Sequence, residues 1–307
     1  MIEIVTQSVA MREVVRLAER VAGTDANVLI TGESGSGKDA LALYIHSRSR
    51  RSPHSMVKID CASLPSELLE AELFGYESGA FTGATEAKPG RLEAAHQGTL
   101  LLDEIAHLSM DAQAKLLRVI EEREFERLGG RRTIKVDARL ITLTNVDIED
   151  AVKRHRFRED LFYRLNVVRL HLPPLRERRE DIAALALRFL KIYAGKHGRG
   201  VTSLSPEALT ALKSYDFPGN VRELANTIER AVIVSSTATI EETELPGSLR
   251  AAVALQRRGR RQTLAEVEAD YVADTLELAR GNKSEAARIL GISRKNLYER
   301  LERKGEG

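Results

Sequence analysis

A short apolar run followed by a glycine-rich turn constrains this chain more than any other feature of its sequence. Residues 27–39 read NVLITGESGSGKD, and the apolar or β-branched residues at 28–31 predict a buried strand. Glycines at 32, 35 and 37 then break regular structure before Lys38, which begins a predicted helix. The spacing Gly-x-x-x-x-Gly-Lys between a strand and a helix is typical of a phosphate-binding loop. Its backbone N–H groups can surround a phosphate chain, the helix N-terminus favours anions, and the lysine reaches the outer phosphates.

The residue that follows this lysine departs from the usual form of the loop. Ser or Thr commonly stands there and binds Mg²⁺ through its hydroxyl. Asp39 takes that place, so one magnesium ligand is predicted to be altered or to act through water. The candidate nucleotide-binding residues of the loop are consecutive: Gly32, Glu33, Ser34, Gly35, Ser36, Gly37, Lys38 and Asp39.

A second apolar run ends in two carboxylates. Residues 98–104, GTLLLDE, predict a buried strand that ends at Asp103 and Glu104. Beside a phosphate loop, Asp103 can hold Mg²⁺ through water and Glu104 can polarise an attacking water. One of the two could instead cap the helix predicted from Asp111, but this explanation is strained for both. A further β-rich run, 139–144, leads to Asn145, where a polar side chain would lie near a γ-phosphate or its water.

Length and composition fit a cytoplasmic protein with more than one domain. The 307 residues predict two or three domains, one of them large enough for a full core. The single cysteine, Cys61, cannot form an internal disulfide, which fits a reducing compartment, and it is expected to be a small buried residue rather than a nucleophile. The N-terminus does not resemble an export signal and no apolar run approaches about 18 residues, so neither secretion nor a membrane span is predicted.

Strands and helices alternate up to residue 172, which predicts an α/β fold with a parallel sheet and helices on both of its faces. The other elements expected in this part are a helix over 11–21, a strand over 56–60, a helix over 65–73 and a hairpin over 125–136. After Pro173-Pro174 the pattern becomes helical, with helices expected over 181–193, from Ser205 and from Asn220. We therefore assign residues 1–172 to an α/β part and 173–245 to an all-helical part.

Residues 75–90 predict a flexible loop, because four glycines and a proline fall within them. Phe81 stands in this loop between Gly79 and Gly83. On composition alone, a phenylalanine is expected to turn back into the core, and an exposed position is the alternative.

The C-terminal region is predicted to be a linker followed by a helix-turn-helix, over 246–262 and 263–307. The linker has no clear apolar stripe and ends in arginines around Gly259, which favours a solvated segment over a direct DNA contact. Helices are expected over 264–276, 282–290 and 293–303, with a sharp turn at Gly291. From Arg250 to Lys304, thirteen Arg and Lys stand against eight Asp and Glu, a local +5 where DNA would be bound. The candidate DNA-binding residues are Arg294, Lys295, Asn296, Arg300 and Arg303.

With these features the chain resembles a sigma-54-dependent transcription activator, a bacterial enhancer-binding protein of the AAA+ class, over nearly all of its length. The most specific likeness is to the GAFTGA loop, with which these activators contact the sigma factor. That likeness overturns the interpretation of Phe81 as a core residue. The residues of the loop here are Gly79, Ala80, Phe81, Thr82, Gly83 and Ala84.

The resemblance implies a role for the nucleotide-site residues. Residues 32–38 are similar to the Walker A loop and Asp103-Glu104 to the Walker B pair, with Asp103 as metal ligand. Asn145 is similar to the sensor of the γ-phosphate. Arg222 matches the second sensor, on the helical lid.

The resemblance also assigns residues outside that site. Arg158 and Arg164 look like arginine fingers, which in a ring enter the site of the neighbouring subunit. Residues 282–301, NKSEAARILGISRKNLYERL, are similar to a Fis-type helix-turn-helix. No receiver or ligand-sensing domain precedes Met11, which implies either a member controlled by a separate protein or a truncated chain.

Asp60 departs from the family pattern, in which an Asn usually precedes the Cys. In the resembling family that Asn donates a hydrogen bond to the Walker B glutamate, and an ionised Asp has no such donor. Two carboxylates about 4 Å apart repel by roughly 4 kcal/mol at an effective dielectric constant near 20, so Asp60 and Glu104 must share a proton, recruit a cation or stay apart. We favour separation. The remaining alternative is that Asp60 only caps the next turn and is no part of a switch.

The resemblance implies an ATPase that uses ATP and Mg²⁺, binds double-stranded DNA upstream of promoters and remodels the closed complex of sigma-54 RNA polymerase holoenzyme. Its copies would form a homo-oligomer, from a dimer to a ring of six or seven, without contact with a membrane. One alternative is a DNA-binding regulator whose nucleotide site only controls its oligomeric state, against which Glu104 and the GAFTGA loop argue. A protein unfoldase with an aromatic pore loop is another, but it has no use for a C-terminal helix-turn-helix.

Overall fold

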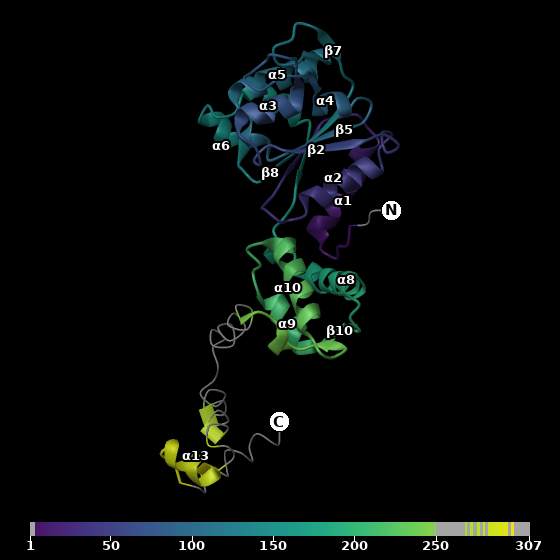
Figure 1. Cartoon of the computed structure of the whole chain (residues 1–307). Coiled ribbons are helices and arrows are strands. Elements are labelled where there is room, and N and C mark those ends of the chain that lie inside the picture. The colour runs from purple at the N-terminus through teal and green to yellow at the C-terminus, as the bar shows by residue number, and fades with distance from the viewer. Residues whose placement is uncertain are drawn as a thin grey trace. The chain divides into compact units, whose positions relative to one another are not determined.

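The computed structural model describes residues 4–247 without a gap and, further on, residues 249, 268, 271–272, 275–276, 279, 282–293 and 296–297. The chain divides into two compact units, Met1–Pro246 and Gly247–Gly307. Figure 1 draws the first unit in purple to green and the described residues of the second in yellow. Each unit is described by itself.

Within the described residues, a five-stranded parallel sheet forms the centre of the first unit. In spatial order its strands are β2 (Met56–Asp60), β5 (Thr99–Asp103), β8 (Arg139–Thr144), β1 (Val28–Thr31) and β9 (Val168–His171). The register pairs Thr31 with Thr144 and Asp60 with Asp103. Because β8 lies between β1 and β5, the carboxyl ends of these strands meet at one edge, which is where open α/β sheets bind ligands. The predicted parallel α/β sheet is confirmed.

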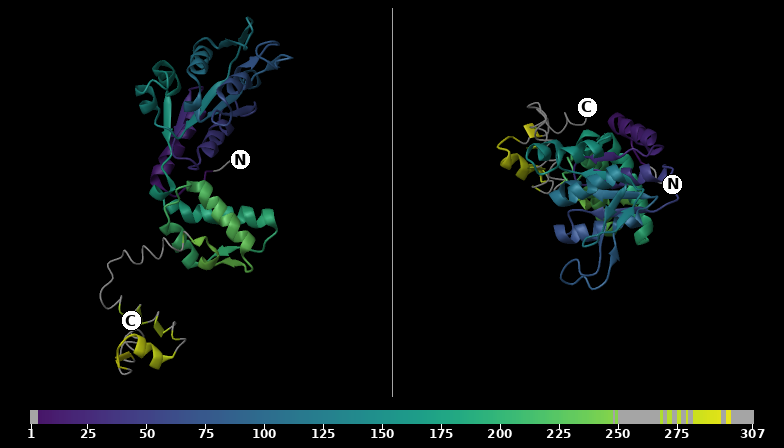
Figure 2. Two further views of the ribbon diagram at one scale, coloured as in Figure 1. Left: turned by 60° about the vertical axis from the view of Figure 1, so that its left-hand side comes forward. Right: turned by 90° about the horizontal axis from the view of Figure 1, so that it is seen from above.

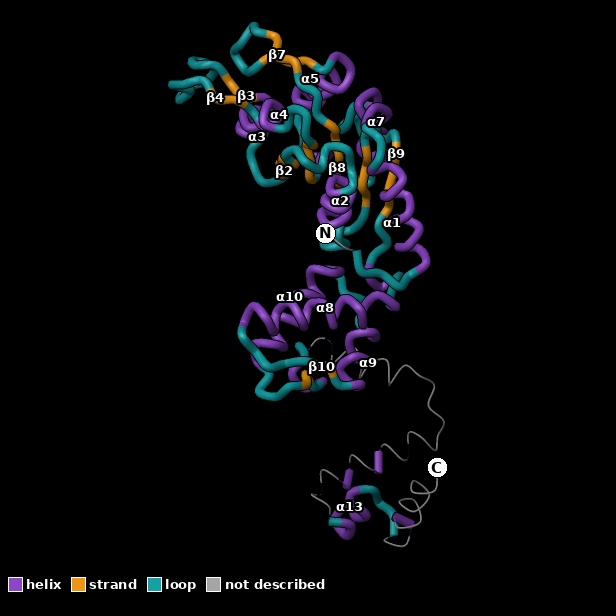
Figure 3. The backbone as a smooth tube through the Cα atoms, turned by 90° about the vertical axis from the view of Figure 1, so that its right-hand side faces the viewer, coloured by secondary structure: helices purple, strands orange, loops and turns teal. Residues whose placement is uncertain are grey.

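Helices cover both faces of this sheet, because successive strand residues point to opposite faces. The helices are α1 (Val9–Ala22), α2 (Lys38–Ser47), α3 (Ser66–Phe74), α4 (Arg91–Ala94), α5 (Met110–Glu122), α6 (Ile148–Lys153) and α7 (Glu159–Leu165). Leu100 and Leu102 pack with α3 to α7, whereas Ile30 and Leu101 pack with α1 and α2. Figures 2 and 3 show the strands enclosed between these helices.

Two short antiparallel pairs extend one end of the α/β part, as Figure 3 shows. β3 (Gly75–Tyr76) pairs with β4 (Lys88–Pro89) and closes the base of the glycine-rich loop. β6 (Glu124–Glu126) pairs with β7 (Thr133–Lys135), which confirms the predicted hairpin. Tyr76 also forms a β-bridge with Leu128 of the hairpin. The base of the loop is therefore joined to the segment that connects β6 with β7.

The rest of the first unit consists mainly of α8 (Glu180–His197), α9 (Pro206–Ser214) and α10 (Asn220–Val234). Ser205 caps α9 by accepting a hydrogen bond from the N–H of Ala208. Short 3₁₀ turns connect elements of the unit: η1 (Ile105–His107), η2 (Leu175–Glu177) and η3 (Glu242–Glu244). The part predicted to be all helical also contains a parallel pair, β10 (Ser203–Leu204) with β11 (Thr239–Ile240). Runs of two residues have no periodicity, so the sequence pattern could not reveal this pair.

In the second unit, helix α13 (Lys283–Ile289) agrees with the helix expected over 282–290. Asn282 caps it by accepting hydrogen bonds from two backbone N–H groups. Gly291 follows with a φ of 66°, the sharp turn expected there. A small core contains Val272, Ala286, Ala287 and Leu297. The helices expected over 264–276 and 293–303 lie largely outside the described residues.

None of the described helices is both long and apolar enough to span a membrane.

Arg139, the first residue of β8, is buried with only 2% of its surface exposed. Its guanidinium donates hydrogen bonds to the carbonyl oxygens of Val21 at 2.9 Å, Ala22 at 3.1 Å and Ala26 at 3.3 Å. The first two belong to the last turn of α1, where carbonyl groups have no partner within the helix. Arg139 therefore ties the end of α1 to the sheet.

Replacing Arg139 by Met should remove its hydrogen bonds to the carbonyl oxygens of Ala22 and Ala26, whereas the carbonyl oxygen of Val21 still accepts from Thr24. We expect the free energy of unfolding, measured with urea, to fall by about 1–3 kcal/mol. The control Arg131→Met, at an exposed position of the β6–β7 hairpin, should change it by less than about 0.5 kcal/mol. Equal stability of the two variants would contradict the capping role of Arg139.

Candidate functional site

A cavity of about 260 Å³ opens at the carboxyl edge of the sheet, next to α8 and α10. The α/β part lines it with Ser34, Gly35, Gly37, Lys38, Asp39, Ala40, Asp103 and Glu104. The helical part lines it with Phe189, Val221, Arg222 and Ala225. The structure thus brings together most of the predicted phosphate-binding residues, the predicted carboxylate pair and Arg222.

Lys38 is buried and held by its own loop. Its Nζ donates hydrogen bonds to the carbonyl oxygens of Gly32 at 2.9 Å and Glu33 at 3.3 Å, and lies 3.9 Å from Oε1 of Glu104. Burial lowers the pKa of Lys38, and the charges of Glu104 and Asp103 oppose this shift. Because its main partners are neutral carbonyl groups, the ammonium can exchange them for anionic phosphate oxygens.

The glycines of the turn are required by its backbone. Gly37 precedes α2 with a φ of 107°, and Gly35 has a φ of 75°, both in the region that favours glycine. Gly35 also lies against the start of α10, since a Cβ there would stand 2.4 Å from the carbonyl oxygen of Gly219. The turn can therefore pack on the helical part only without a side chain at this position.

The two carboxylates at the end of β5 have different surroundings. Asp103 lies 2.8 Å from Nζ of Lys58. Glu104 has a φ of 52° and a ψ of 51°, a left-handed conformation that costs a non-glycine residue about 1–3 kcal/mol. Its Oε2 accepts a hydrogen bond from the backbone N–H of Asn145 at 3.1 Å. The alternative that one of the two carboxylates caps α5 is wrong, because Ser109 caps that helix.

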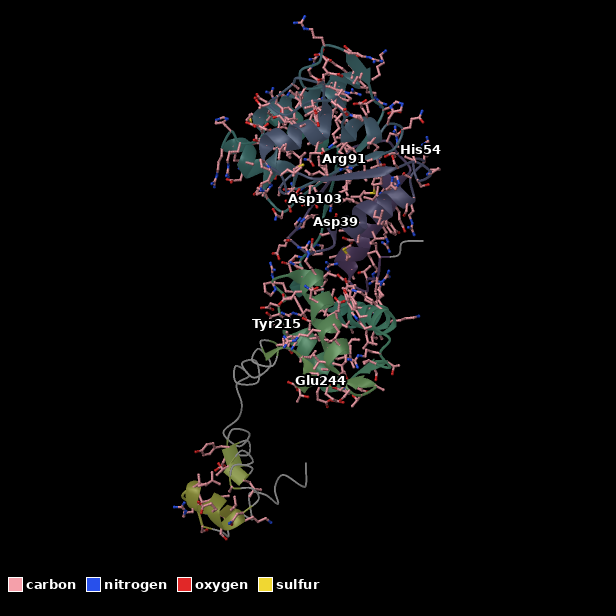
Figure 4. The ribbon with its side chains drawn as sticks, viewed as in Figure 1. Asp39, His54, Arg91, Asp103, Tyr215 and Glu244 are labelled. Atoms are coloured by element: carbon pink, nitrogen blue, oxygen red, sulfur yellow. The ribbon has the colours of Figure 1, made fainter. Side chains whose placement is uncertain are left out.

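Lys58 joins Asp39 to Asp103. From β2, its ammonium forms an ion pair with Oδ1 of Asp39 and another with Oδ2 of Asp103. Figure 4 labels Asp39 and Asp103, which come from the start of α2 and the end of β5. Burial acts to lower the pKa of Lys58, but hydrogen bonds to the two carboxylates raise it above its ordinary value. The sequence analysis did not predict a role for Lys58. The available signal was its position two residues before Asp60 on the same predicted strand.

Asp60 and Glu104 have separate partners. Oδ1 of Asp60 accepts a hydrogen bond from the N–H of Ala62 at 2.9 Å, which is how a carboxylate caps a turn. Glu104 is instead bonded to Asn145. This geometry agrees with the expectation that the two carboxylates stay apart, and with the alternative in which Asp60 only caps a turn.

The helical part holds the glycine-rich turn through polar contacts. Asn220, the first residue of α10, is fully buried and has a φ of 53°. Its amide nitrogen donates to the carbonyl oxygen of Ser34 and to Oε2 of Glu33, both at 3.1 Å. Arg176 donates two further hydrogen bonds to Glu33, at 2.6 and 2.8 Å. These bonds from Arg176 and Asn220 lower the pKa of Glu33 to about 2.

Two more arginines contact the same turn. The backbone N–H of Arg222 donates to the carbonyl oxygen of Gly35 at 3.3 Å, and its Nη1 donates to Oγ of Ser34 at 3.1 Å. Arg178, which is buried, donates to the carbonyl oxygen of Ser36. Sequence reasoning identified Arg222 but missed Arg176, Arg178 and Asn220, because contacts between distant segments leave no local pattern.

Arg158 and Arg164 are not among the described residues that line the cavity. Arg158 pairs with Asp160 at 2.8 Å, and Arg164 pairs with Glu121 at 3.0 Å. Exposed ion pairs of this kind are weak. Both guanidinium groups can therefore exchange these partners for a group on another molecule.

The loop of residues 75–90 is closed by its own hydrogen bonds and exposes Phe81. The N–H of Gly79 donates to the carbonyl oxygen of Ala84 at 2.8 Å, and the N–H of Ala84 donates to that of Phe81 at 3.0 Å. Phe81 is 42% exposed, and its ring meets that of Tyr76 edge-on at a centroid distance of 5.0 Å. The expectation from composition alone, that Phe81 returns to the core, is wrong. A groove beside the loop is lined by Ala80, Phe81, Thr82, Glu67, Leu68, Glu70, Leu128 and Gly129.

Asn296 is the one candidate DNA-binding residue that the structure describes. It is exposed, and its N–H donates to Oγ of Ser293 at 3.2 Å. The other candidates lie outside the described residues: Arg294, Lys295, Arg300 and Arg303.

Family models match the chain over most of its length. Residues 4–171 match a sigma-54 interaction domain, residues 176–262 an AAA+ ATPase lid domain, and residues 263–303 a bacterial regulatory protein domain of the Fis family. The chain belongs to the sigma-54-dependent transcriptional regulators. The resemblance inferred from its motifs is confirmed.

Individual members of this family are similar to the regulator over nearly its whole length. Regulatory protein AtoC of Escherichia coli is 46% identical over 311 residues, which cover 98% of this chain and 68% of AtoC. Transcriptional regulatory protein ZraR of Salmonella typhimurium is 47% identical over 297 residues, which cover 96% of this chain and 67% of ZraR. The crystal structure of NtrX from Brucella abortus in complex with ATP is 35% identical, with a TM-score of 0.75, and the match covers 99% of this chain and 70% of NtrX.

In this regulator, Gly35→Ala should disturb both the glycine-rich turn and its contact with α10. The backbone conformation and the carbonyl oxygen of Gly219 leave no room for a Cβ. We expect the affinity for a fluorescent ADP analogue to fall at least about tenfold, and the unfolding temperature to fall as well. Gly23→Ala, where a Cβ meets no atom within 4 Å, is the matched control and should change neither quantity. Undiminished nucleotide affinity in Gly35→Ala would contradict this reading of the turn.

Proposed function

We propose that this protein is an ATPase that assembles into a ring, binds double-stranded DNA upstream of a promoter and remodels the closed complex of sigma-54 RNA polymerase holoenzyme. The observation that most supports this proposal is that two separate sites lie within the first unit. The glycine-rich turn, the carboxylate pair and Arg222 line one cavity, while Phe81 is exposed on a separate loop. The similar protein NtrX has been solved with ATP and with ADP.

The functional parts of the chain follow from this proposal. Residues 1–172 form the nucleotide-binding part and 173–245 the lid, with residues 246–262 as a linker to the DNA-binding part, 263–307. Residues 79–84 contact the sigma factor. In the DNA-binding part, Arg side chains suit guanine edges and Asn296 suits an adenine edge.

The chemistry is phosphoryl transfer to water, in which positioning and charge stabilisation supply most of the catalysis. The backbone N–H groups of residues 32–38 surround the phosphates, and Lys38 turns from the loop carbonyl groups to the phosphate oxygens. Glu104, oriented by the N–H of Asn145, accepts a hydrogen bond from the attacking water. The side chain of Asn145 senses the γ-phosphate, and the γ-phosphoryl group passes to water to give ADP and phosphate.

The residues near the end of β5 fit a magnesium ion. Mg²⁺ prefers oxygen ligands and is often held by one or two carboxylates together with substrate phosphates. Asp39 and Asp103 present such oxygens close together, and a cationic group, the ammonium of Lys58, lies between them. Asp103 would hold the ion, with Asp39 acting directly or through water. A magnesium ion held there would supply positive charge against the nucleotide phosphates.

Arg158 and Arg164 would complete the site of a neighbouring copy. Their present partners, Asp160 and Glu121, form exposed ion pairs that are readily given up. A guanidinium group supplied by a neighbour stabilises the charge that develops on the γ-phosphoryl group. Hydrolysis would therefore depend on assembly of the ring.

Two substitutions should separate nucleotide binding from hydrolysis. Lys38→Ala removes the cation that meets the phosphates and should abolish ATP binding, measured by fluorescence of a labelled analogue. Glu104→Gln keeps the side-chain volume and an acceptor for Asn145 but loses the basic carboxylate. It should bind ATP normally and lower phosphate release at least about 100-fold. An equal loss of binding in both variants would contradict the assigned roles.

Phe81→Ala should separate hydrolysis from activation. The side chain is exposed and outside the nucleotide cavity, so ATP hydrolysis should stay within about twofold of wild type, while promoter melting with the sigma-54 holoenzyme should be lost. Val234→Ala, at an exposed position near the end of α10, is the control and should retain both activities. If Phe81→Ala lost its ATPase activity but still bound the sigma factor, Phe81 would have a structural role instead.

A further inference from the structure

We infer that Lys58 is an internal counter-ion that occupies the magnesium position between Asp39 and Asp103 in the absence of nucleotide, and that the metal displaces it. This inference rests on the proposed magnesium-dependent ATPase activity. It assigns a role in nucleotide loading to a residue outside the phosphate-binding loop and the carboxylate pair.

The place of Lys58 in the sheet explains how it reaches both carboxylates. Its neighbours on β2, Val57 and Ile59, pack in the core on the α3 side of the sheet. Successive strand residues point to opposite faces, so Lys58 points to the α2 side, where Asp39 lies in the first turn of α2. There its Nζ meets Asp39 and lies 2.8 Å from Oδ2 of Asp103.

The charges around the cavity favour such a cation. Asp39 stands where this type of loop commonly has a neutral hydroxyl, so it adds a negative charge close to Asp103 and Glu104. Lys38 lies near Glu104, and Lys58 pairs with the other two carboxylates. Without Lys58 or a metal ion, Asp39 and Asp103 would repel each other. Lys58 therefore balances the negative charges of Asp39 and Asp103 in the nucleotide-free site, as a magnesium ion would in the nucleotide-bound site.

The ammonium of Lys58 and the magnesium ion compete, which predicts the direction in which each affinity changes when Lys58 is replaced. Both use the oxygens of Asp39 and Asp103, so Mg²⁺ alone binds poorly until a nucleotide supplies additional oxygen ligands. Removal of the Lys58 charge should tighten magnesium binding. The same change should weaken the binding of metal-free ADP, because the site becomes more negative. A residue that only supported the shape of the site would weaken both.

The test compares the full-length protein with Lys58→Met. The affinity of a fluorescent ADP analogue is first measured in EDTA, and the analogue complex is then titrated with Mg²⁺. We expect metal-free affinity to fall about fivefold and the magnesium concentration at the midpoint to fall about fivefold. Mg²⁺ without nucleotide should raise the unfolding temperature of Lys58→Met but not that of the wild type.

Three further variants make the test specific. Lys88→Met removes a lysine that pairs with Glu72 away from the cavity and should behave as wild type. Lys58→Arg keeps the charge and should preserve the wild-type response to magnesium. Lys58→Gln repeats the test with a polar side chain, should the Met variant fold poorly.

An unchanged or raised magnesium midpoint in Lys58→Met and Lys58→Gln would overturn the role of Lys58 while leaving the proposed ATPase intact. Failure of the wild-type protein to bind ADP at all would overturn the proposed function as well.

Discussion

The contact between the lid and the glycine-rich turn is the interaction on which the rest of the site depends. Asn220 is fully buried, and its amide is bonded to Ser34, Glu33 and the N–H of Leu175. Leaving such a group without partners costs about 1–3 kcal/mol, so these bonds fix the start of α10 against the turn. Any rearrangement of the turn around a phosphate must therefore move α10, with Arg222, or break these bonds.

A continuous segment connects the carboxylate edge of the sheet with the exposed loop. β2 ends at Asp60 beside Asp103, and a turn capped by Asp60 leads into α3. Leu69 and Leu73 of α3 are almost fully buried, so this helix is held firmly in the core. It ends where β3 closes the base of the loop with Phe81. A short stretch of chain therefore connects the nucleotide site with the surface proposed to contact the sigma factor.

Local patterns in the sequence predicted the elements of this fold better than the contacts between them. The apolar runs at 28–31, 98–104 and 139–144 predicted strands, because buried parallel strands are apolar on both faces. The sequence patterns did not predict that Lys58, Arg176 and Asn220 belong to the site, because each contacts a segment distant in the sequence. The Asp60 carboxylate shows the same limit: the sequence left open three arrangements with Glu104 and a fourth in which Asp60 only caps the next turn, and the coordinates give its Oδ1 the N–H of Ala62.

We propose that ATP hydrolysis in the cavity bounded by the lid drives the Phe81 loop against the sigma-54 holoenzyme. Promoter melting tests it most directly, with the wild-type protein, sigma-54 RNA polymerase and a sigma-54 promoter, detected by permanganate reactivity of unpaired thymines. The account predicts melting with ATP and none with a non-hydrolysable analogue that binds the same site. Equal melting with the analogue, or none with ATP while ATP is hydrolysed, would contradict it.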